Sequence, residues 1–170
     1  ITTMKVINSL EDVKSFINDY KSDTTISLIP TMGNIHSGHI KLIKSASSSS
    51  LKIVSIYVNE LQFNDRSDYI SYPRTIDNDL SICEDNNVDL VFAPDSSVVR
   101  KQLDVNINNL PKFTTYMCGA NRPGHFSGVY RIVKFLFEIL EPNYAYFGKK
   151  DFQQLLLIKY IANTYFPKLR

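Results

Sequence analysis

The sequence has few cysteines, few histidines and no long apolar run. Its two cysteines, Cys83 and Cys118, lack the pairing of a metal site, which is typical of a protein in a reducing cytoplasm. No stretch approaches the ~18 apolar residues that cross a membrane, and the first residues lack the charged-then-apolar order of a secretory signal. We therefore expect a cytoplasmic protein that has no membrane partner.

A strong net charge is also missing. The 19 basic and 17 acidic side chains leave a formal charge of +2, which gives no field strong enough to hold a nucleic-acid backbone. We therefore expect no nucleic-acid partner. The length of 170 residues and the 44% hydrophobic content are enough for one domain with a real core, so we expect a single domain over residues 1–170.

Predicted strands alternate with predicted helices along the chain. Short apolar or β-branched runs predict strands at residues 4–7, 25–30, 52–59, 89–94 and 144–148. Helical periodicity predicts helices at residues 10–20, 37–48, 75–86, 126–140 and 151–165. This alternation predicts an α/β fold, a Rossmann-like doubly wound parallel sheet in three layers. Residues 61–74 and 96–116 are polar and are predicted to be long connections.

Four polar motifs fall just after predicted strands or at the start of predicted helices. They are PTMGNIHSGH, YVNELQF, NRPGHFSG and FGKKDFQQ. In an open parallel sheet, ligands bind beyond the carboxyl ends of the strands, where helix N-termini point their N–H groups outward. The motifs are therefore predicted to form one site.

Two of the three histidines stand in the first motif. His36 and His39 are three residues apart at a predicted helix start, where Gly33 and Gly38 let the backbone approach a ligand. Two imidazoles beside exposed amides suit an anionic phosphate. They could equally be metal ligands, although no third ligand stands at a convincing spacing, or ordinary turn and helix-start residues.

The motifs also carry a resemblance. HSGH matches the H-x-G-H signature of the nucleotidyltransferase superfamily. PTMGNIHSGH, SIYVNELQF, YPRT, ANRPGHFSGV and YFGKKDFQQL, in this order, resemble the pantoate–β-alanine ligase family over nearly the whole chain. The resemblance implies ATP-dependent condensation of D-pantoate with β-alanine through a pantoyl adenylate, with release of pyrophosphate and AMP. It also implies Mg²⁺ bound with ATP and a homodimer.

The resemblance implies roles for residues in each motif. The implied catalytic residues are His36, His39, Arg122 and Lys150. The implied ATP-binding residues are Pro30, Thr31, Met32, Gly33, His36, His39, Gly148, Lys150 and Asp151. The implied pantoate-binding residues are Met32, Asn59, Gln62, Arg122 and Gln154.

Structural alternatives stay open for several of these residues. Asn59 and Gln62 could cap a loop at the end of a strand, and Asp151 could be only a helix N-cap. His125 could simply cap the helix that follows it. Asp77 and Asp79 are possible aids to Mg²⁺, but acidic residues early in a helix also suit its dipole.

The sequence departs from the family pattern at several positions. Glu60 stands where the family usually has proline, and Cys118 and Lys149 stand where glutamate is common. The family continues into a loop that covers the ATP phosphates and a smaller C-terminal domain, whereas this sequence ends at Arg170. We therefore expect weak or absent ligase activity from these 170 residues alone.

Two other functions stay open. One is a different nucleotidyltransferase with the H-x-G-H signature, which would not need the V-N-x-x-Q-F and R-P-G-H-F blocks. The other is a non-catalytic nucleotide-binding domain, which would be expected to carry damaged motifs.

Overall fold

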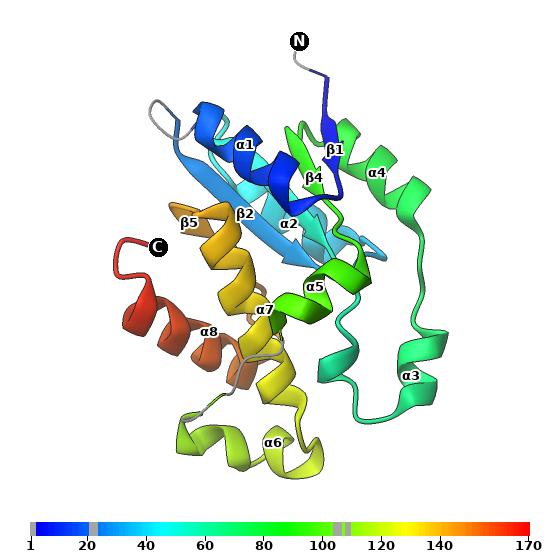
Figure 1. The fold of residues 1–170 in the computed structure, drawn as a ribbon, viewed down its shortest axis with the longest axis vertical. Coiled ribbons are helices and arrows are strands. Elements are labelled where there is room, and N and C mark those ends of the chain that lie inside the picture. The colour runs from blue at the N-terminus through cyan, green and yellow to red at the C-terminus, as the bar shows by residue number, and fades with distance from the viewer. Residues whose placement is uncertain (1–2, 21–23, 104–106, 108–109) are drawn as a thin grey trace.

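The computed structural model describes residues 3–20, 24–103, 107 and 110–170. In these residues a five-stranded parallel sheet has the order β1-β4-β3-β2-β5 (Figure 1). The strands are β1 (Lys5–Ile7), β2 (Ile26–Thr31), β3 (Leu51–Ile56), β4 (Leu90–Phe92) and β5 (Tyr144–Ala145). The register pairs Leu28 with Ile53 and Ile53 with Leu90 at the centre of the sheet.

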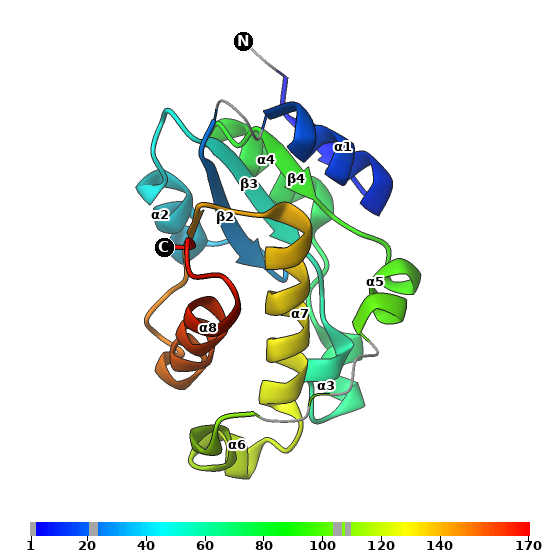
Figure 2. The ribbon, with the colours of Figure 1, turned by 60° about the vertical axis from the view of Figure 1, so that its left-hand side comes forward.

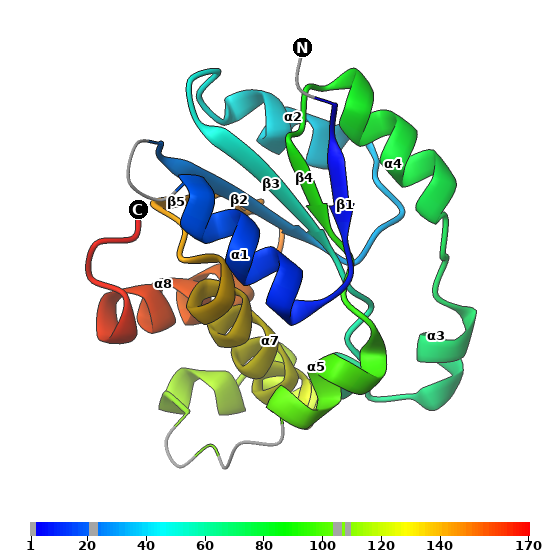
Figure 3. The ribbon, with the colours of Figure 1, turned by 45° about the horizontal axis from the view of Figure 1, so that its top comes forward.

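Helices cover both faces of the sheet, which confirms the doubly wound α/β prediction. The longer helices are α1 (Leu10–Tyr20), α2 (Ser37–Ser45), α4 (Ile76–Asp85), α7 (His125–Leu140) and α8 (Phe152–Tyr165). Figure 3 shows α1 and α7 on one face and α2 and α4 on the other. Side chains alternate along a strand, so Leu28 packs with the α1 and α7 side and Ile29 with the α2 and α4 side.

The two faces carry separate cores. The larger core includes Val13 and Phe16 of α1 and a long buried stripe of α7 that contains Phe137 and Leu140. The smaller core joins Ile43 of α2 and Cys83 of α4 to the other face of the sheet. Helix α8 packs against α7 rather than on the sheet itself (Figure 2).

The two segments predicted as polar connections contain short helices, so that prediction was wrong in part. The first segment holds η1 (Glu60–Gln62), which begins one residue before it, and α3 (Arg66–Ser71). The second holds α5 (Ser96–Leu103) and η2 (Lys112–Thr115), and α6 (Cys118–Asn121) follows it. Helix α5 forms because Val99 and Leu103, four residues apart, bury one narrow apolar face. Residues 104–106 and 108–109 of the second segment lie outside the described residues.

Strand β5 is shorter than the predicted strand over residues 144–148. It pairs with β2 at Ser27 and Leu28, and the chain then leaves the sheet after one more hydrogen bond, from Tyr146 N–H to the carbonyl of Leu28 (2.9 Å). The backbone of Arg170 bonds to Asn143 and Ala145, at 3.0 and 2.9 Å. Residues 147–151 are thereby free to form a loop at the carboxyl end of the sheet.

Candidate functional site

A cavity of about 1000 Å³ lies at the point where the connections of the sheet diverge. Strand β2 continues through α2 to β3 on one side, while its other neighbour β5 continues into α8. Such a divergence leaves a crevice outside the carboxyl ends of two adjacent strands, which is where open α/β sheets bind ligands. All four polar motifs contribute residues to the lining of this cavity.

The turn between β2 and α2 is held by a buried carboxylate. Asp79 of α4 is 1% exposed and accepts the N–H groups of Asn34 (2.9 Å) and Ile35 (2.7 Å). Gly33 (φ 78°) adopts a left-handed conformation readily, whereas Asn34 (φ 50°) is a non-glycine residue in that region, which the hydrogen bonds of Asp79 help to hold. Asp79, which lies outside the cavity lining, therefore fixes the backbone that leads into His36.

His36 and His39 form the start of helix α2. The Nδ1 atom of His36 accepts the N–H of Gly38 at 3.0 Å, and Nδ1 of His39 lies 3.4 Å from the backbone nitrogen of His36. Because each Nδ1 faces a donor, each neutral ring carries its proton on Nε2. Burial lowers the pKa of His39, and the neighbouring His36 lowers it further. Both residues line the cavity, so the ring that caps the helix can also donate to a ligand.

The segment after β3 is fixed against helix α7. Asn59 is 1% exposed, and its Nδ2 donates to the carbonyl of Gly128 (3.0 Å) and to Oε1 of Gln62 (3.2 Å). Its Oδ1 accepts the N–H of Leu61 at 3.3 Å. The expected loop-capping role of Asn59 is thus present, while both Asn59 and Gln62 also line the cavity.

Gln62 is in contact with the turn after β2. Its Nε2 lies 3.1 Å from Sδ of Met32, so two residues expected to bind pantoate are in contact. A Cβ at Gly128 would come within 2.4 Å of the Leu61 backbone, so α7 carries glycine where it meets η1. The position of Gln62 therefore depends on close backbone packing.

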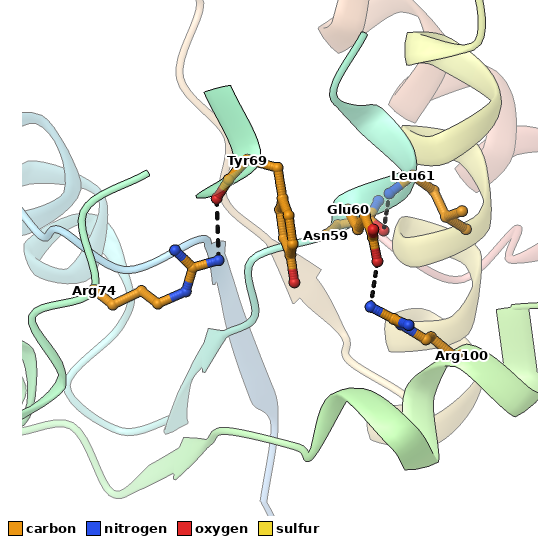
Figure 4. A network of polar contacts seen from close by, with 6 residues as sticks. All are labelled: Asn59, Glu60, Leu61, Tyr69, Arg74 and Arg100. Carbon is orange, nitrogen blue, oxygen red and sulfur yellow. Dashed lines mark hydrogen bonds and ion pairs between the residues drawn. The ribbon is translucent and has the colours of Figure 1, made fainter. Parts of the chain in front are cut away.

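Glu60 points away from the cavity. Its carboxylate forms an ion pair with Arg100 of α5, as Figure 4 shows. Nearby, Arg74 donates to the carbonyl of Tyr69 at 3.1 Å and lies over the ring of the same tyrosine. The charge at the position where the family usually has proline is therefore neutralised outside the site.

His125 ties the start of α7 to η1. Its Nδ1 lies 2.8 Å from the carbonyl oxygen of Gln62, and burial lowers its pKa. Gly124, with φ 83°, occupies the N-cap position, so the interpretation of His125 as a cap of its own helix was wrong. Arg122, three residues earlier, lines the cavity together with His125.

The last motif brings residues from the loop after β5. Lys150, Asp151 and Gln154 line the cavity. Asp151 occupies the N-cap position of α8 but makes no side-chain capping hydrogen bond, which leaves its carboxylate available for another partner. Gly33 and Gly148, expected near ATP, do not line the cavity.

The described residues offer no clear protein cage for a metal ion. No group of three His, Cys, Asp or Glu side chains comes together in the part of the chain that the structure describes. Asp79 is occupied by backbone N–H groups and by the hydroxyl of Thr75 (3.1 Å), and neither it nor Asp77 lines the cavity. Asp151 is the one carboxylate among the described lining residues.

The lining also includes residues to which the sequence assigned no role in the site. Tyr57 and Tyr72 lie near the two ends of the polar segment after β3, and burial raises the pKa of each hydroxyl. Val129, Val133 and Leu136 of α7 form an apolar wall. Helical periodicity predicts a buried stripe on α7 but does not show which part of it faces a cavity.

Comparison with known proteins agrees with the motifs. The family model described as pantoate-beta-alanine ligase matches residues 5–169. The chain belongs to the pantoate–β-alanine ligase family. A pantothenate synthetase of Leptospira biflexa is 43% identical over 158 residues, which cover 91% of this chain and 56% of that protein. One from Clostridium botulinum is also 43% identical over 158 residues, covering 92% and 56%.

Solved structures of the family share the fold. A pantoate-beta-alanine ligase of Francisella tularensis, solved in complex with beta-gamma ATP and beta-alanine, has a TM-score of 0.93 and 36% identity. The likeness covers 98% of this chain and 65% of that one. A pantothenate synthetase of Thermus thermophilus has a TM-score of 0.87 at 30% identity, covering 98% and 60%. The chain thus spans less than two thirds of the length of these ligases.

No helix in the described ranges is both long and apolar enough to cross a membrane.

Proposed function

We propose that this chain supplies the ATP- and pantoate-binding domain, over residues 1–170, of an enzyme that joins D-pantoate to β-alanine. The observation that carries the proposal is the convergence of His36, His39, Arg122 and Lys150 on one cavity at the divergence of β2 and β5. Membership of the family supports the same reaction, as does the ATP and β-alanine complex of the Francisella tularensis ligase.

The first step is adenylation of the pantoate carboxylate. A carboxylate oxygen attacks the α-phosphorus of ATP, the bond to the bridging oxygen breaks, and pyrophosphate leaves. Negative charge grows on the phosphate oxygens during this transfer. The Nε2–H groups of His36 and His39 and the ammonium of Lys150 would stabilise that charge.

The second step transfers the pantoyl group to an amine. The β-alanine amine attacks the carbonyl carbon of the adenylate, AMP leaves, and the amine loses a proton as the amide forms. A carboxylate becomes a good electrophile once it carries AMP, so no nucleophilic side chain is required. The main catalytic contribution of the enzyme would therefore be to hold the reactants in line.

The remaining lining residues are assigned to the substrates. Met32, Gln62, Arg122 and Gln154 would bind pantoate, with Asn59 fixing the segment that carries Gln62. Pro30, Thr31 and Asp151 would contact ATP, and the free carboxylate of Asp151 suits the ribose hydroxyls. Gly33 and Gly148 would act through the backbone shape of their loops.

Magnesium would be bound mainly by the ATP phosphates and water. Mg²⁺ keeps several waters and commonly uses only one or two protein carboxylates, which agrees with a lining that offers Asp151 alone.

The proposal also includes a homodimer and a cytoplasmic location, which family membership suggests. Light scattering in solution tests the first of these.

The direct test is pyrophosphate release from ATP and Mg²⁺ in the presence of D-pantoate, followed by pantothenate formation when β-alanine is added. The protein as its gene encodes it should release pyrophosphate only with pantoate present. Release with a mononucleotide or phosphorylated alcohol instead would favour a different nucleotidyltransferase. ATP binding without any transfer would favour a non-catalytic domain.

A further inference from the structure

The side chain of Gln153 joins helix α8 to the segment before α6. Its Nε2 donates to the carbonyls of Phe113 and Tyr116, both at 2.8 Å, and its Oε1 accepts the N–H of Cys118 at 3.1 Å. Two acceptors on one end and a donor on the other fix the orientation of the amide. Both ends of the Gln153 amide are thus hydrogen-bonded to the backbone of residues 113–118.

That stretch contains a strained residue. Met117 has φ 51° and ψ −117°, a conformation that non-glycine residues rarely adopt. Two of the Gln153 hydrogen bonds hold the carbonyl just before Met117 and the N–H just after it. Met117 is 76% exposed, so burial of its own side chain gives the turn little support.

The surrounding backbone leaves little room for another arrangement. The N–H of Gly119 bonds to the carbonyl of Tyr116 at 2.9 Å. A Cβ at Gly119 would lie 1.7 Å from the carbonyl oxygen of Thr114, so the turn and η2 pack backbone to backbone. We call the three hydrogen bonds of the Gln153 side chain the clamp. The clamp therefore holds a compact turn that has one strained residue, Met117, at its centre.

The turn leads directly into the cavity lining. Met117 and Cys118 line the cavity, and Arg122, the C-cap residue just after α6, lines it as well. We infer that Gln153 is a positioning residue that holds the Met117 turn so that Cys118 and Arg122 face the bound hydroxy acid. The identity of that ligand rests on the proposed function, whereas the clamp rests on the hydrogen bonds alone.

The variants separate the clamp from general stability. Gln153→Ala removes all three hydrogen bonds, and Gln153→Glu keeps the acceptor but turns a carboxylate oxygen toward two carbonyls. Asn163→Ala is the matched control, since Asn163 is exposed on the same helix and outside the cavity lining. Met117→Gly removes the strain, because glycine adopts positive φ readily.

Two measurements test the inference in the protein as its gene encodes it. Amide hydrogen exchange at Cys118 and Gly119 should be about tenfold faster or more in Gln153→Ala, and unchanged in Asn163→Ala. The KM for D-pantoate in pyrophosphate release should rise about tenfold in Gln153→Ala and at least as much in Gln153→Glu, while the KM for ATP changes less than about threefold. Adding Met117→Gly should restore most of the loss.

Each contrary result has a separate meaning. Unchanged exchange at Cys118 and Gly119 in Gln153→Ala would overturn the clamp, and an unchanged KM for D-pantoate would overturn the positioning role. Failure of Met117→Gly to restore binding would overturn the account based on strain. If the wild-type protein released no pyrophosphate, the proposed function would fail, while hydrogen exchange would still decide whether the clamp exists.

Discussion

The imidazole rings of His36 and His39 lie 4.2 Å apart, centroid to centroid, and are tilted by 35°. In both rings Nδ1 faces a backbone N–H group at the start of α2, so Nε2 carries the proton in each neutral ring. The same pair therefore caps a helix and offers two N–H donors. A structural and a chemical role coincide in two side chains, and mutation can separate them.

Replacing His36 tests that separation. His36→Ala removes the N-cap acceptor and the Nε2 donor, so we expect the free energy of unfolding to fall by about 1 kcal/mol. His36→Ser restores an N-cap acceptor, and stability should return to near the wild-type value. Both variants should lower kcat for pyrophosphate release by about 100-fold or more, since both lack the donor. Wild-type rates in His36→Ser would assign the histidine to capping alone.

The lowered pKa values of His39 and His125 predict a pH-dependent stability. Each folded-state pKa lies below the ordinary value of 6.5, so the unfolded chain takes up protons first as the pH falls. The free energy of unfolding should therefore decrease from about pH 6.5 toward pH 5. Urea unfolding at several pH values measures this decrease, and the double variant His39→Gln with His125→Gln should show a smaller decrease. An equally large decrease in the double variant would assign the pH dependence to other groups.

Asp79 is predicted to stabilise the fold. Asp79→Ala leaves the N–H groups of Asn34 and Ile35 without their carboxylate, so the free energy of unfolding should fall by about 2 to 4 kcal/mol. Asp77→Ala is the matched control, because Asp77 is an exposed carboxylate on the same first turn of α4. Urea unfolding compares the two variants. Equal, small losses would show that the turn before α2 does not need the carboxylate.

Gly128 is predicted to be irreplaceable where α7 meets η1. A methyl group there would lie 2.4 Å from the Leu61 backbone and 2.6 Å from the nitrogen of Gln62. Gly128→Ala should therefore lower the free energy of unfolding by about 2 kcal/mol or more and weaken D-pantoate binding. Gly148→Ala is the stability control, since a Cβ there meets no atom within 4 Å. A stable Gly128→Ala protein would mean that η1 can move aside without cost.

Local pattern predicted the elements that carry strong periodicity. Helix α7 has an apolar face over several turns, and β2 is mostly apolar, so neighbouring residues alone indicate their structure. Helix α5 was missed because it buries only Val99 and Leu103 within a polar stretch. Strand β5 was predicted too long, because its pairing depends on β2, a partner that lies far away in the sequence.

The sequence by itself determined the alternation of strands and helices, the family motifs and the residue types at the candidate site, because these depend on local spacing and order. Only the tertiary structure decided how the side chains are used. It turned Asp79 toward two backbone N–H groups, set His125 against the carbonyl of Gln62 and made Gln153 a clamp across the Met117 turn. Each of these hydrogen bonds joins residues at least 35 positions apart, so their geometry exists only once the sheet and helices have packed.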